Sequence, residues 1–349
     1  MPDQVDVSVL IPVLNEEAHL RSAAEAMLAQ DFPGRAEFLF IDGGSDDGSV
    51  AILHDLVAAD DRVRVLANPA RRTPHALNVG LRAARGTFVA RMDAHTLYPP
   101  RYLASGVERL RRGDCEWVSG PQLAVGADGG SRLVARALGA SLGKGGARFR
   151  DALEQEHEVD TGFTGIWYRA TLERHNGWDE EWLNDQDLEL AARIRKAGGR
   201  IVCIPAMAAQ YVPRSTLRAL ARQYLTYGTY RVKTARRHPE TLRRSQLLPP
   251  LVTLTAAGAV AAPTRRLRSL ARLGLVLYAG ALALSAARAA DDGRRAEAAA
   301  LPGVWAVMHL SYGIGFLRGS ARYGPPLEAV RRTAGLGAGS PPADGERRG

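Results

Sequence analysis

Two residues that could hold a metal ion stand at the end of one apolar stretch, residues 89–95. This stretch reads Val-Ala-Arg-Met-Asp-Ala-His, which is typical of a buried strand that ends on Asp93 and, two residues later, on His95. Side chains at the carboxyl end of such a strand lie at the edge where open α/β sheets bind their ligands. A carboxylate and an imidazole there can hold a divalent cation that bridges a diphosphate. Asp93 also has a simpler reading, because an Asp at a strand end often forms a turn or caps a helix.

Two further polar residues follow neighbouring apolar stretches and fit a nucleotide. Asp42 opens the loop 42–49, and its carboxylate can accept hydrogen bonds from a nucleobase or a ribose. Arg72, in the basic loop 71–74, can neutralise a phosphate. The chain has neither the Gly-rich dinucleotide fingerprint nor the P-loop signature. We therefore expect loops and a cation to hold a nucleoside diphosphate.

A carboxylate near the middle of the chain could supply a base. Transfer of a group from a nucleoside diphosphate to a hydroxyl needs a base that takes the proton of the acceptor. Asp187 stands at the start of a predicted helix, behind an acid-rich approach, and is the best placed candidate. An Asp at a helix N-terminus is also a common cap, and Asp185 could take either role.

The elements that must position these residues alternate between strand and helix. Apolar runs predict strands over 5–13, 36–41, 63–66, 87–92, 115–119 and 200–204. Amphipathic spacing predicts helices over 16–29, 50–59, 76–84, 101–111 and 188–197. Alternation of this kind predicts an α/β fold with a mostly parallel sheet flanked by helices. The polar loops all follow strands, so they should meet at one edge of the sheet.

Composition narrows the class of partner. The chain has 349 residues and a formal net charge of +9, and its arginines concentrate after Arg193 while its acidic residues concentrate before Asp187. This asymmetry predicts that the second half of the chain lies near an anionic partner surface. We expect no nucleic acid, because zinc-finger spacing, helix-turn-helix patterns and RNA-binding aromatic motifs are missing. Cys115 and Cys203 lie in apolar runs and are expected in the core of a protein from a reducing compartment.

Three charge-free runs, residues 247–263, 273–287 and 298–317, predict a membrane-associated region. A bilayer needs about 20 apolar residues, so each run is a marginal span. An Ala-rich helical bundle packed on the catalytic domain is one alternative. A shallow re-entrant hairpin or an interfacial placement is another, because the arginines after the first run would otherwise oppose the positive-inside rule. In that case these arginines would lie on anionic headgroups. They are Arg265, Arg266, Arg268 and Arg272.

Five motifs in order resemble those of family 2 inverting glycosyltransferases of GT-A fold. They are Ile-Pro-Val-Leu-Asn-Glu-Glu at 11–17, Ile-Asp-Gly-Gly-Ser-Asp-Asp-Gly-Ser at 41–49, Ala-Leu-Asn-Val-Gly at 76–80, Asp-Ala-His at 93–95 and Gln-Asp at 186–187. The resemblance covers residues 5–209. Segments 213–217, 223–228 and 309–316 further resemble succinoglycan-type exopolysaccharide glycosyltransferases, whose C-terminus is membrane-associated.

The resemblance implies a role for each matching residue. Donor binding would fall to Pro12, Asn15 and Glu17 in the nucleoside pocket, Asp42 at the base, and Gln223 with Arg231 at the diphosphate. Asp93 and His95 would hold the metal, Asp187 would be the general base, and Gly162, Thr164 and Gly165 would border the acceptor pocket.

Three departures from the family pattern refine this reading. His95 stands where an acid is usual, which favours Mn²⁺ over Mg²⁺ by ligand softness. Gln186 replaces the acid that usually precedes the base and removes a like charge that would raise the pKa of Asp187. Thr226 and Tyr227 stand where processive synthases carry Arg-Trp, which predicts one transfer per acceptor.

Together these observations predict a metal-dependent inverting glycosyltransferase at the cell membrane, with its catalytic domain in the cytoplasm. It would move a sugar from a nucleotide-diphosphate donor, a UDP-sugar first of all, to a hydroxyl of a lipid-linked saccharide in exopolysaccharide or cell-surface glycan synthesis. Alternatives are transfer to polyprenyl phosphate and a non-catalytic sugar-nucleotide-binding membrane protein. The predicted regions are a catalytic domain (1–215), an amphipathic helical linker (216–246), membrane-associated helices (247–320) and a disordered tail (321–349).

Overall fold

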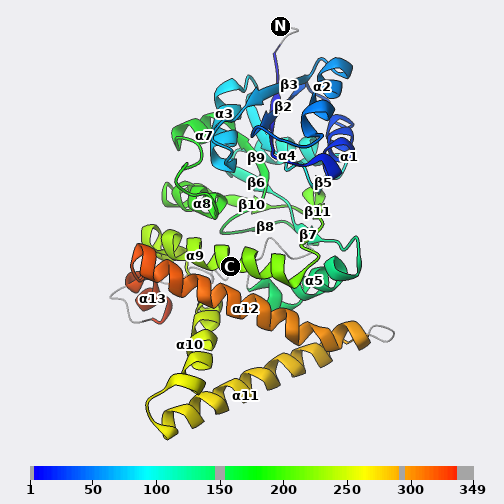
Figure 1. Cartoon of the computed structure of the whole chain (residues 1–349). Helices are drawn as coiled ribbons and strands as arrows, with labels where there is room; N and C mark the ends of the chain where they lie inside the picture. The colour runs from blue at the N-terminus through cyan, green and yellow to red at the C-terminus, as the bar shows by residue number, and fades with distance from the viewer. Residues whose placement is uncertain (1–3, 146–153, 291–294, 336–349) are drawn as a thin grey trace. The chain divides into compact units, whose positions relative to one another are not determined.

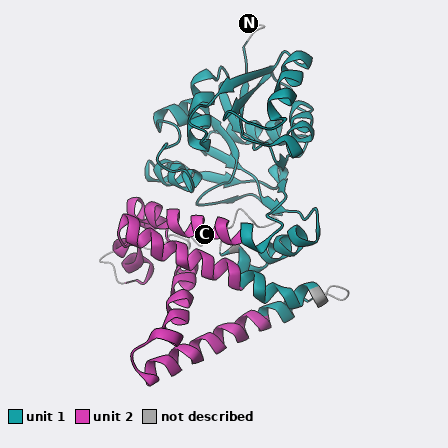
Figure 2. Ribbon diagram, in the orientation of Figure 1, with its two compact units in different colours: residues 1–219, 285–305 teal, residues 220–284, 306–349 magenta. Residues whose placement is uncertain are grey.

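The computed structural model describes residues 4–145, 154–290 and 295–335. The chain forms two compact units, shown in Figure 2. The first consists of Met1–Ala219 with Ser285–Trp305, and the second of Leu220–Leu284 with Ala306–Gly349. The predicted catalytic region, 1–215, falls within the first unit. The predicted divisions at 246 and 320 do not coincide with the boundaries of the units.

The first unit is built on an eight-stranded sheet of order β3-β2-β1-β4-β9-β6-β10-β8 (Figure 1). One half is parallel and consists of β1 (Val7–Val13), β2 (Ala36–Asp42), β3 (Val63–Ala67) and β4 (Phe88–Arg91). The predicted mostly parallel α/β sheet is confirmed. Because these strands run in the same direction, their carboxyl ends share one edge, where Asp42 and Asp93 lie.

The other half of the sheet is mixed. β9 (Gly165–Tyr168) runs antiparallel between β4 and β6 (Trp117–Ser119), and β10 (Ile201–Cys203) is parallel to β6. β8 (His157–Glu158) closes the edge, antiparallel to β10. β9 was not predicted, because a run of four apolar residues is too short for its period to be recognised.

Helices cover both faces of the sheet because successive strand residues point to opposite sides. Val7, Val9 and Ile11 of β1 pack in one core cluster with α1 (Glu17–Leu28), α2 (Ser49–Ala59) and α4 (Tyr102–Leu110). Leu10 packs in the other cluster with α3 (Thr73–Ala83) and α8 (Gln186–Lys196). Each predicted helix is present, and α3 begins three residues before its predicted start, with Pro74 in its first turn.

Smaller elements complete the first unit. A second sheet has the order β5-β11-β7, formed by β5 (Thr96–Leu97), β11 (Ala209–Tyr211) and β7 (Gln122–Ala124). The segment after β7 contains α5 (Gly129–Gly139) and the short α6 (Ser141–Lys144). α5 begins with a capping box of Asp128 and Ser131. α7 (Arg169–Arg174) follows β9 directly.

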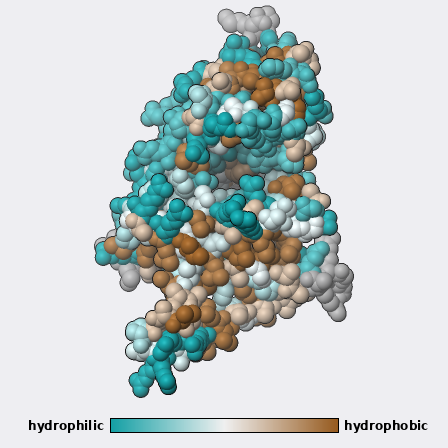
Figure 3. Space-filling model, in the orientation of Figure 1, coloured by the Kyte–Doolittle hydropathy of each residue, from teal (hydrophilic) through white to brown (hydrophobic). Residues whose placement is uncertain are grey.

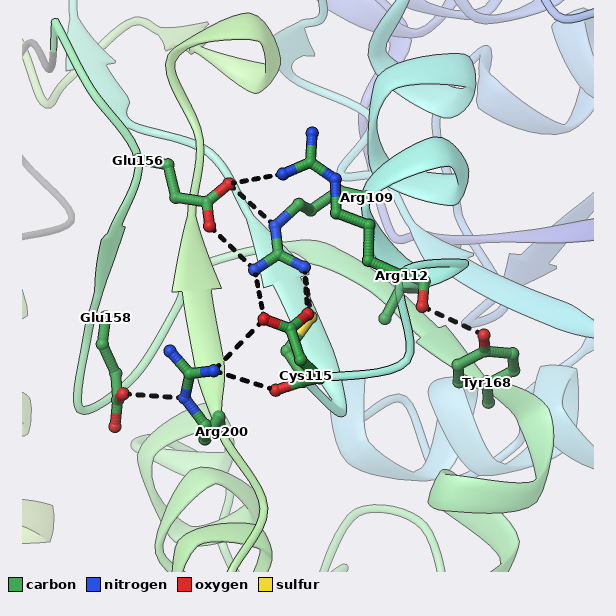
Figure 4. Close-up of polar contacts among 9 residues, drawn as sticks. Arg109, Arg112, Cys115, Glu156, Glu158, Tyr168 and Arg200 are labelled. Atoms are coloured by element: carbon green, nitrogen blue, oxygen red, sulfur yellow. Dashed lines mark hydrogen bonds and ion pairs between the residues drawn. The ribbon is translucent and has the colours of Figure 1, made fainter.

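An ion-pair cluster joins α4 to the far half of the sheet (Figure 4). Arg109 of α4 is buried and donates to Asp114 at 2.5 Å and to Glu156 at 2.7 Å. Arg200 contacts Asp114 at 3.2 Å and Glu158 at 3.0 Å. We call Arg109, Asp114, Glu156, Glu158 and Arg200 the Arg109 cluster.

Both cysteines are buried and free, as the sequence predicts for core residues. Cys115 lies beside Arg109, with its Sγ 3.6 Å from Nη1. Burial raises the pKa of the Cys115 thiol to about 11. A thiol with this pKa is protonated and unreactive at neutral pH, so Cys115 serves packing.

The second unit is helical. It contains most of α9 (Leu217–Arg237), all of α10 (Leu248–Ala261) and α13 (Leu327–Thr333), and parts of α11 (Arg265–Arg288) and α12 (Arg295–Tyr323). Glycines let α9 and α12 approach closely: a Cβ on Gly228 would lie 2.1 Å from the Tyr312 carbonyl oxygen. α13 lies within the predicted tail, and its Ala329 is buried; residues 336–349 of that tail lie outside the described residues.

Two described helices are long and apolar enough to cross a membrane. They are α11 and the part of α12 from Glu297 to Tyr323. The most apolar window of α11 is only 11% buried, whereas that of α12 is 44% buried. The first of the three predicted runs forms α10, whose 14 residues are too few for a span.

Candidate active site

A buried arginine that the sequence analysis did not single out lies at the centre of the site. Arg91, the last residue of β4, donates from Nε and Nη2 to the two carboxylate oxygens of Asp93, at 2.9 and 3.2 Å. Its Nη1 donates to Asp187 Oδ1 at 2.6 Å. The predicted metal ligand and the predicted base, 94 positions apart in the sequence, therefore share one guanidinium.

The sheet holds Arg91 from both sides. It pairs with Leu10 of β1 and with Gly165 of β9, so its backbone lies in the middle of the sheet. The ring centroid of Phe163, just before β9, lies 5.8 Å from the guanidinium carbon, within the range of a cation–π contact. The arginine side chain is only 4% exposed. A charged residue in this position can persist only when it is paired.

Asp187 reaches Arg91 because the chain turns sharply before α8. Asp185, the N-cap, has a φ of 63°, and Asp187 follows in the first turn of the helix. Asn78 of α3 fixes the approach: its Nδ2 donates to the Trp178 carbonyl at 2.8 Å, and its Oδ1 accepts from the Trp178 N–H at 3.0 Å. The position of Asp187 thus depends on α3 as well as on α8.

The electrostatics of the site leave Asp187 unusually basic. Burial raises the pKa of Asp187 to about 6; Arg91 opposes this shift and the charge of Asp93 adds to it. Burial by itself would lower the pKa of Arg91, but the charges of Asp187 and Asp93 raise it, so the guanidinium stays charged. A carboxylate with a pKa near 6 is ionised at pH 7 and is better matched than an ordinary Asp to take a proton.

Asp93 and His95 are the predicted metal ligands, and each makes a further hydrogen bond. The backbone N–H of Asp93 donates to the hydroxyl of Tyr98 at 2.7 Å. His95 Nδ1 lies 3.0 Å from Glu16 Oε1. This hydrogen bond raises the pKa of His95, with a smaller contribution from the charge of Asp93. Glu16, another residue that the sequence analysis did not assign, therefore orients the His95 ring.

The protein groups alone offer too few ligands for a cation. No cluster of three or more His, Cys, Asp or Glu side chains that could bind a metal occurs among the described residues. Both oxygens of Asp93 accept from Arg91, but a carboxylate has further lone pairs to offer. Mg²⁺ and similar cations are often held by one or two carboxylates together with substrate phosphates. Asp93 and His95 fit a divalent cation in that way, with phosphate oxygens completing its shell.

A cleft runs along this edge of the sheet, between the end of β1, the loop before α3 and residues 93–95. Of the predicted site residues, Pro12, Arg72, Asp93 and His95 line it. The remaining lining residues are Val13, Leu14, Glu16, Gly43, Asn68, Arg71, Thr73, Ala76 and Arg91. Three arginines in one cleft suit a ligand with several negative charges.

Three other predicted donor residues organise the loop 42–49. Asn15 has a φ of 56°, and its amide exchanges two hydrogen bonds with Asp46, at 2.7 and 3.0 Å. Glu17 accepts from the Gly48 N–H at 3.0 Å. Asp42 accepts from the hydroxyl of Ser45 at 2.7 Å. Direct contact of these three side chains with a nucleoside stays a prediction.

The predicted acceptor residues are packed into the protein. Thr164 is 3% exposed, and its hydroxyl lies 3.0 Å from that of Tyr102. Cβ atoms added at Gly162 and Gly165 would lie 2.5 Å from Ser119 Oγ and 2.2 Å from Trp117 Nε1, respectively. Residues 162–165 therefore form part of the packed core next to Arg91. Their contact with an acceptor stays a prediction.

Gln223 and Arg231 lie on α9, within the second unit. Gln223 Nε2 donates to the hydroxyl of Tyr227, one helical turn along, at 2.8 Å. Their predicted approach to the diphosphate stays a prediction.

Comparison with known proteins identifies the family. The family described as "Glycosyl transferase family 2" matches residues 8–175. The succinoglycan biosynthesis protein ExoA of Rhizobium meliloti (strain 1021) is 31% identical over 324 residues, which are 92% of this chain and 89% of the relative. The chain belongs to glycosyltransferase family 2. It is a glycosyltransferase, and the family prediction made from the five motifs is confirmed.

Another relative and a solved structure are also similar to this chain. A dolichyl N-acetyl-alpha-D-glucosaminyl phosphate 3-beta-D-2,3-diacetamido-2,3-dideoxy-beta-D-glucuronosyltransferase of Methanococcus voltae is 24% identical over 233 residues, covering 64% of this chain and 71% of the relative. A mannosyltransferase of Pyrobaculum calidifontis, solved in complex with GDP-Man and Mn²⁺, superposes with a TM-score of 0.61 at 19% identity, over 90% of this chain and 87% of that one. The GT-A fold prediction is confirmed.

Proposed function

We propose that this family 2 enzyme is a metal-dependent inverting glycosyltransferase that moves a sugar from a nucleotide-diphosphate donor to a hydroxyl of a lipid-linked saccharide. The observation that carries the proposal is the Arg91 bridge between Asp93 and Asp187. Inversion needs a base on the side of the sugar opposite to the leaving diphosphate. A single guanidinium with a candidate metal ligand on one side and a candidate base on the other supports that arrangement.

Each residue then has a defined task. Asp187 accepts the proton of the attacking hydroxyl. Asp93 and His95 would hold the divalent cation, which when bound neutralises the negative charge of the diphosphate. Arg72 and Arg71 line the same cleft and can bind phosphate oxygens. Arg91 keeps the carboxylates of Asp93 and Asp187 a fixed distance apart, so that the two ends of the reaction stay aligned.

The proposed donor is a nucleotide sugar, and the proposed cation is divalent. A UDP-sugar is the first donor to test, with Pro12, Asn15, Glu17 and Asp42 at the nucleoside and Gln223 with Arg231 at the diphosphate. The Pyrobaculum calidifontis mannosyltransferase was solved with GDP-Man and Mn²⁺, which are ligands of the same two classes. GDP-sugars are therefore the second group to test.

The acceptor is proposed to be lipid-linked and to be used in exopolysaccharide or cell-surface glycan synthesis. The names of the two relatives support this: one serves succinoglycan biosynthesis, and the other is named as a transferase to a dolichyl-linked sugar phosphate. The apolar helices α11 and α12 support a position at the cell membrane. We propose that the catalytic domain (1–215) faces the cytoplasm and that the region 247–320 associates with the membrane.

The test is a donor screen with the purified full-length chain. UDP- and GDP-sugars are incubated with a lipid-linked saccharide or polyprenyl phosphate as the acceptor and with Mn²⁺, Mg²⁺ or a chelator, and release of the nucleoside diphosphate is measured. We expect turnover of one donor that stops when the chelator is added. The anomeric configuration of the product is then read by NMR, and we expect inversion. Retention would overturn the mechanism, and donor binding without turnover would favour a non-catalytic sugar-nucleotide-binding protein. Product on polyprenyl phosphate alone would replace the proposed acceptor.

A further inference from the structure

The hairpin of α10 and α11 lies in the most positively charged part of the sequence. Fifteen arginines and six acidic residues follow Glu240, so this part accounts for the whole formal net charge of +9. No acidic residue occurs between Thr241 and Ala290. α10 and the first part of α11 belong to the second unit and are joined by residues 262–264. The turn of this hairpin thus carries charge that no neighbouring acid in the sequence balances.

Arginines gather at the start of α11. Arg265, Arg268 and Arg272 recur at i, i+3 and i+7 and so share one face of the helix. Arg272 Nε donates to the Ala259 carbonyl near the end of α10, at 3.3 Å, so it stabilises the hairpin itself. Arg265 and Arg266 are exposed, and Arg268 is half-buried. We call Arg265, Arg266 and Arg268 the arginine cluster; among the described residues no carboxylate pairs with it.

A stripe of exposed leucines runs along another face of the same helix. Leu270, Leu273 and Leu277 recur at i, i+3 and i+7 and are 64%, 54% and 66% exposed. Leu251 and Leu254 of α10 are exposed as well. Figure 3 shows a hydrophilic patch at the free end of this hairpin with hydrophobic surface next to it. A soluble helix normally buries such a stripe, so its exposure indicates an interaction surface.

We propose that the α10–α11 hairpin binds a bilayer through anionic phospholipids, with the arginine cluster on lipid phosphate groups and the leucine stripe among the acyl chains. The guanidinium group matches phosphate geometry with two parallel hydrogen bonds. Nucleic acid would satisfy the arginines but would leave the leucines in water. The inference rests on the membrane location in the proposed function and adds a dependence on lipid charge.

The lengths of the helices agree with arginines at the headgroup level. α10 has 14 residues and is about 21 Å long, shorter than the roughly 30 Å hydrocarbon core. Arginines at the turn of a hairpin inserted tip-first would enter hydrocarbon, which is costly. An interfacial α11, or an α11 that crosses the bilayer, leaves them at the headgroups. In both placements Arg265, Arg266 and Arg268 need anionic lipid phosphate groups as partners.

The test is flotation of the full-length chain, made by cell-free synthesis without detergent in the presence of vesicles. One vesicle type is phosphatidylcholine alone, and the other contains about one third phosphatidylglycerol. The native chain should partition more strongly to the anionic vesicles. The variant R265Q/R266Q/R268Q should lose about 5-fold per arginine, on the order of 100-fold in all, on anionic vesicles and little on neutral ones. R265K/R266K/R268K keeps the charge and should bind the anionic vesicles much more strongly than R265Q/R266Q/R268Q, but less strongly than the native chain, because an ammonium group lacks the bidentate geometry of guanidinium.

A matched control removes the same charge elsewhere. Arg82, Arg85 and Arg195 are exposed residues of the first unit, and R82Q/R85Q/R195Q should float as the native chain does. Equal flotation of R265Q/R266Q/R268Q and the native chain on anionic vesicles would overturn the inference. Equal flotation of the native chain on both vesicle types would also overturn it, while the membrane location would stand. No flotation on either type would reject the membrane location too, although the donor screen would still report on transfer.

Discussion

Two buried arginines in the same sheet domain each hold two carboxylates, yet the pKa values of Asp114 beside one and of Asp187 beside the other are shifted in opposite directions. Arg109 lowers the pKa of Asp114 and of Glu156 through hydrogen bonds. Arg91 makes equivalent contacts, yet the pKa of its partner Asp187 is raised to about 6. The difference lies in the surroundings: Asp114 is 47% exposed, whereas the Asp187 side chain is 16% exposed and lies near a second acid, Asp93.

The comparison separates a structural role from a chemical one. The Arg109 cluster joins α4 to residues in or just before β6, β8 and β10 (Figure 4). Arg109 lowers the pKa of Asp114 and of Glu156, so these two carboxylates remain ionised at neutral pH. Around Arg91 two acids, Asp93 and Asp187, are removed from water beside one cation. This arrangement is costly for folding but raises the pKa of Asp187. Buried ion pairs alone would therefore not distinguish the candidate active site; the raised pKa of Asp187 and the adjoining cleft do.

The largest expected effect is that of Asp187→Asn. We expect its kcat to fall about 1,000-fold, within the range for loss of a general base, while donor binding measured by calorimetry stays unchanged. Asp114→Asn is the matched control and should keep native kcat. A native rate for Asp187→Asn would show that another group takes the proton.

The same variant should be more stable than the native chain at pH 7. The pKa of Asp187 is higher in the folded state than in the unfolded chain, so the folded state binds more protons between about pH 4 and pH 6. Stability contributed by this group is therefore lost as the pH rises through that window. Asn keeps the uncharged form at every pH, and we expect a gain of up to about 3 kcal/mol at pH 7. Denaturant unfolding measures it; a less stable variant would contradict the burial argument.

A second pair of variants separates the two arginines. Arg91→Gln leaves the buried Asp93 and the half-buried Asp187 without their cation and should cost about 3 kcal/mol of unfolding free energy. Arg109→Gln removes a buried guanidinium from two exposed acids and should cost less. Only Arg91→Gln should also lower kcat, by about 100-fold, because Asp93 and Asp187 would lose their alignment. Rates are measured per folded molecule, below the melting temperature of both variants. Equal losses of kcat would mean that Arg91 acts through stability alone.

The affinity of Asp93 and His95 for Mn²⁺ should increase when a nucleotide is bound. Asp93 and His95 provide too few ligands, so Mn²⁺ should bind weakly to the free enzyme and about 10-fold or more tightly with a nucleoside diphosphate present. Mn²⁺ titration followed by electron paramagnetic resonance measures both affinities. His95→Ala should remove most of this coupling, whereas His19→Ala, an exposed histidine of α1, should not. Tight Mn²⁺ binding without nucleotide would contradict the proposed ligand set.

The smallest effect is expected at the loop 42–49. Asn15→Ala removes two hydrogen bonds to Asp46 on the exposed side of the site. A loss of about 1 kcal/mol in donor binding, near 5-fold in KM with kcat unchanged, is expected. Ser22→Ala, which removes an exposed hydrogen bond of α1, should leave KM unchanged. A large fall in kcat for Asn15→Ala would place this residue closer to the reacting atoms.

Sequence patterns predicted the parallel half of the sheet well, because β1 to β4 are apolar runs separated by amphipathic helices. They did not predict β9, which is four residues long and lies antiparallel between two distant strands. Such a pairing depends on the tertiary fold and leaves no local signal.

The sequence predicted individual residues of the candidate site but not the contacts between them. Asp93 and Asp187 follow from their places at a strand end and a helix start, but nothing local shows that they share a partner. Arg91 carried a signal, since a charge inside an otherwise apolar strand must be paired when buried. Glu16 carried none, because its contact with His95 joins residues 79 positions apart.

The pH dependence of kcat/KM tests the central claim most directly. If Asp187, buried beside Arg91, must be ionised to take the acceptor proton, kcat/KM should be level at pH 7 to 8 and fall about 10-fold per pH unit below about pH 6. Asp114→Asn should show the same profile. A level kcat/KM down to pH 4.5, in enzyme shown to remain folded, would contradict the assignment of Asp187 as the base.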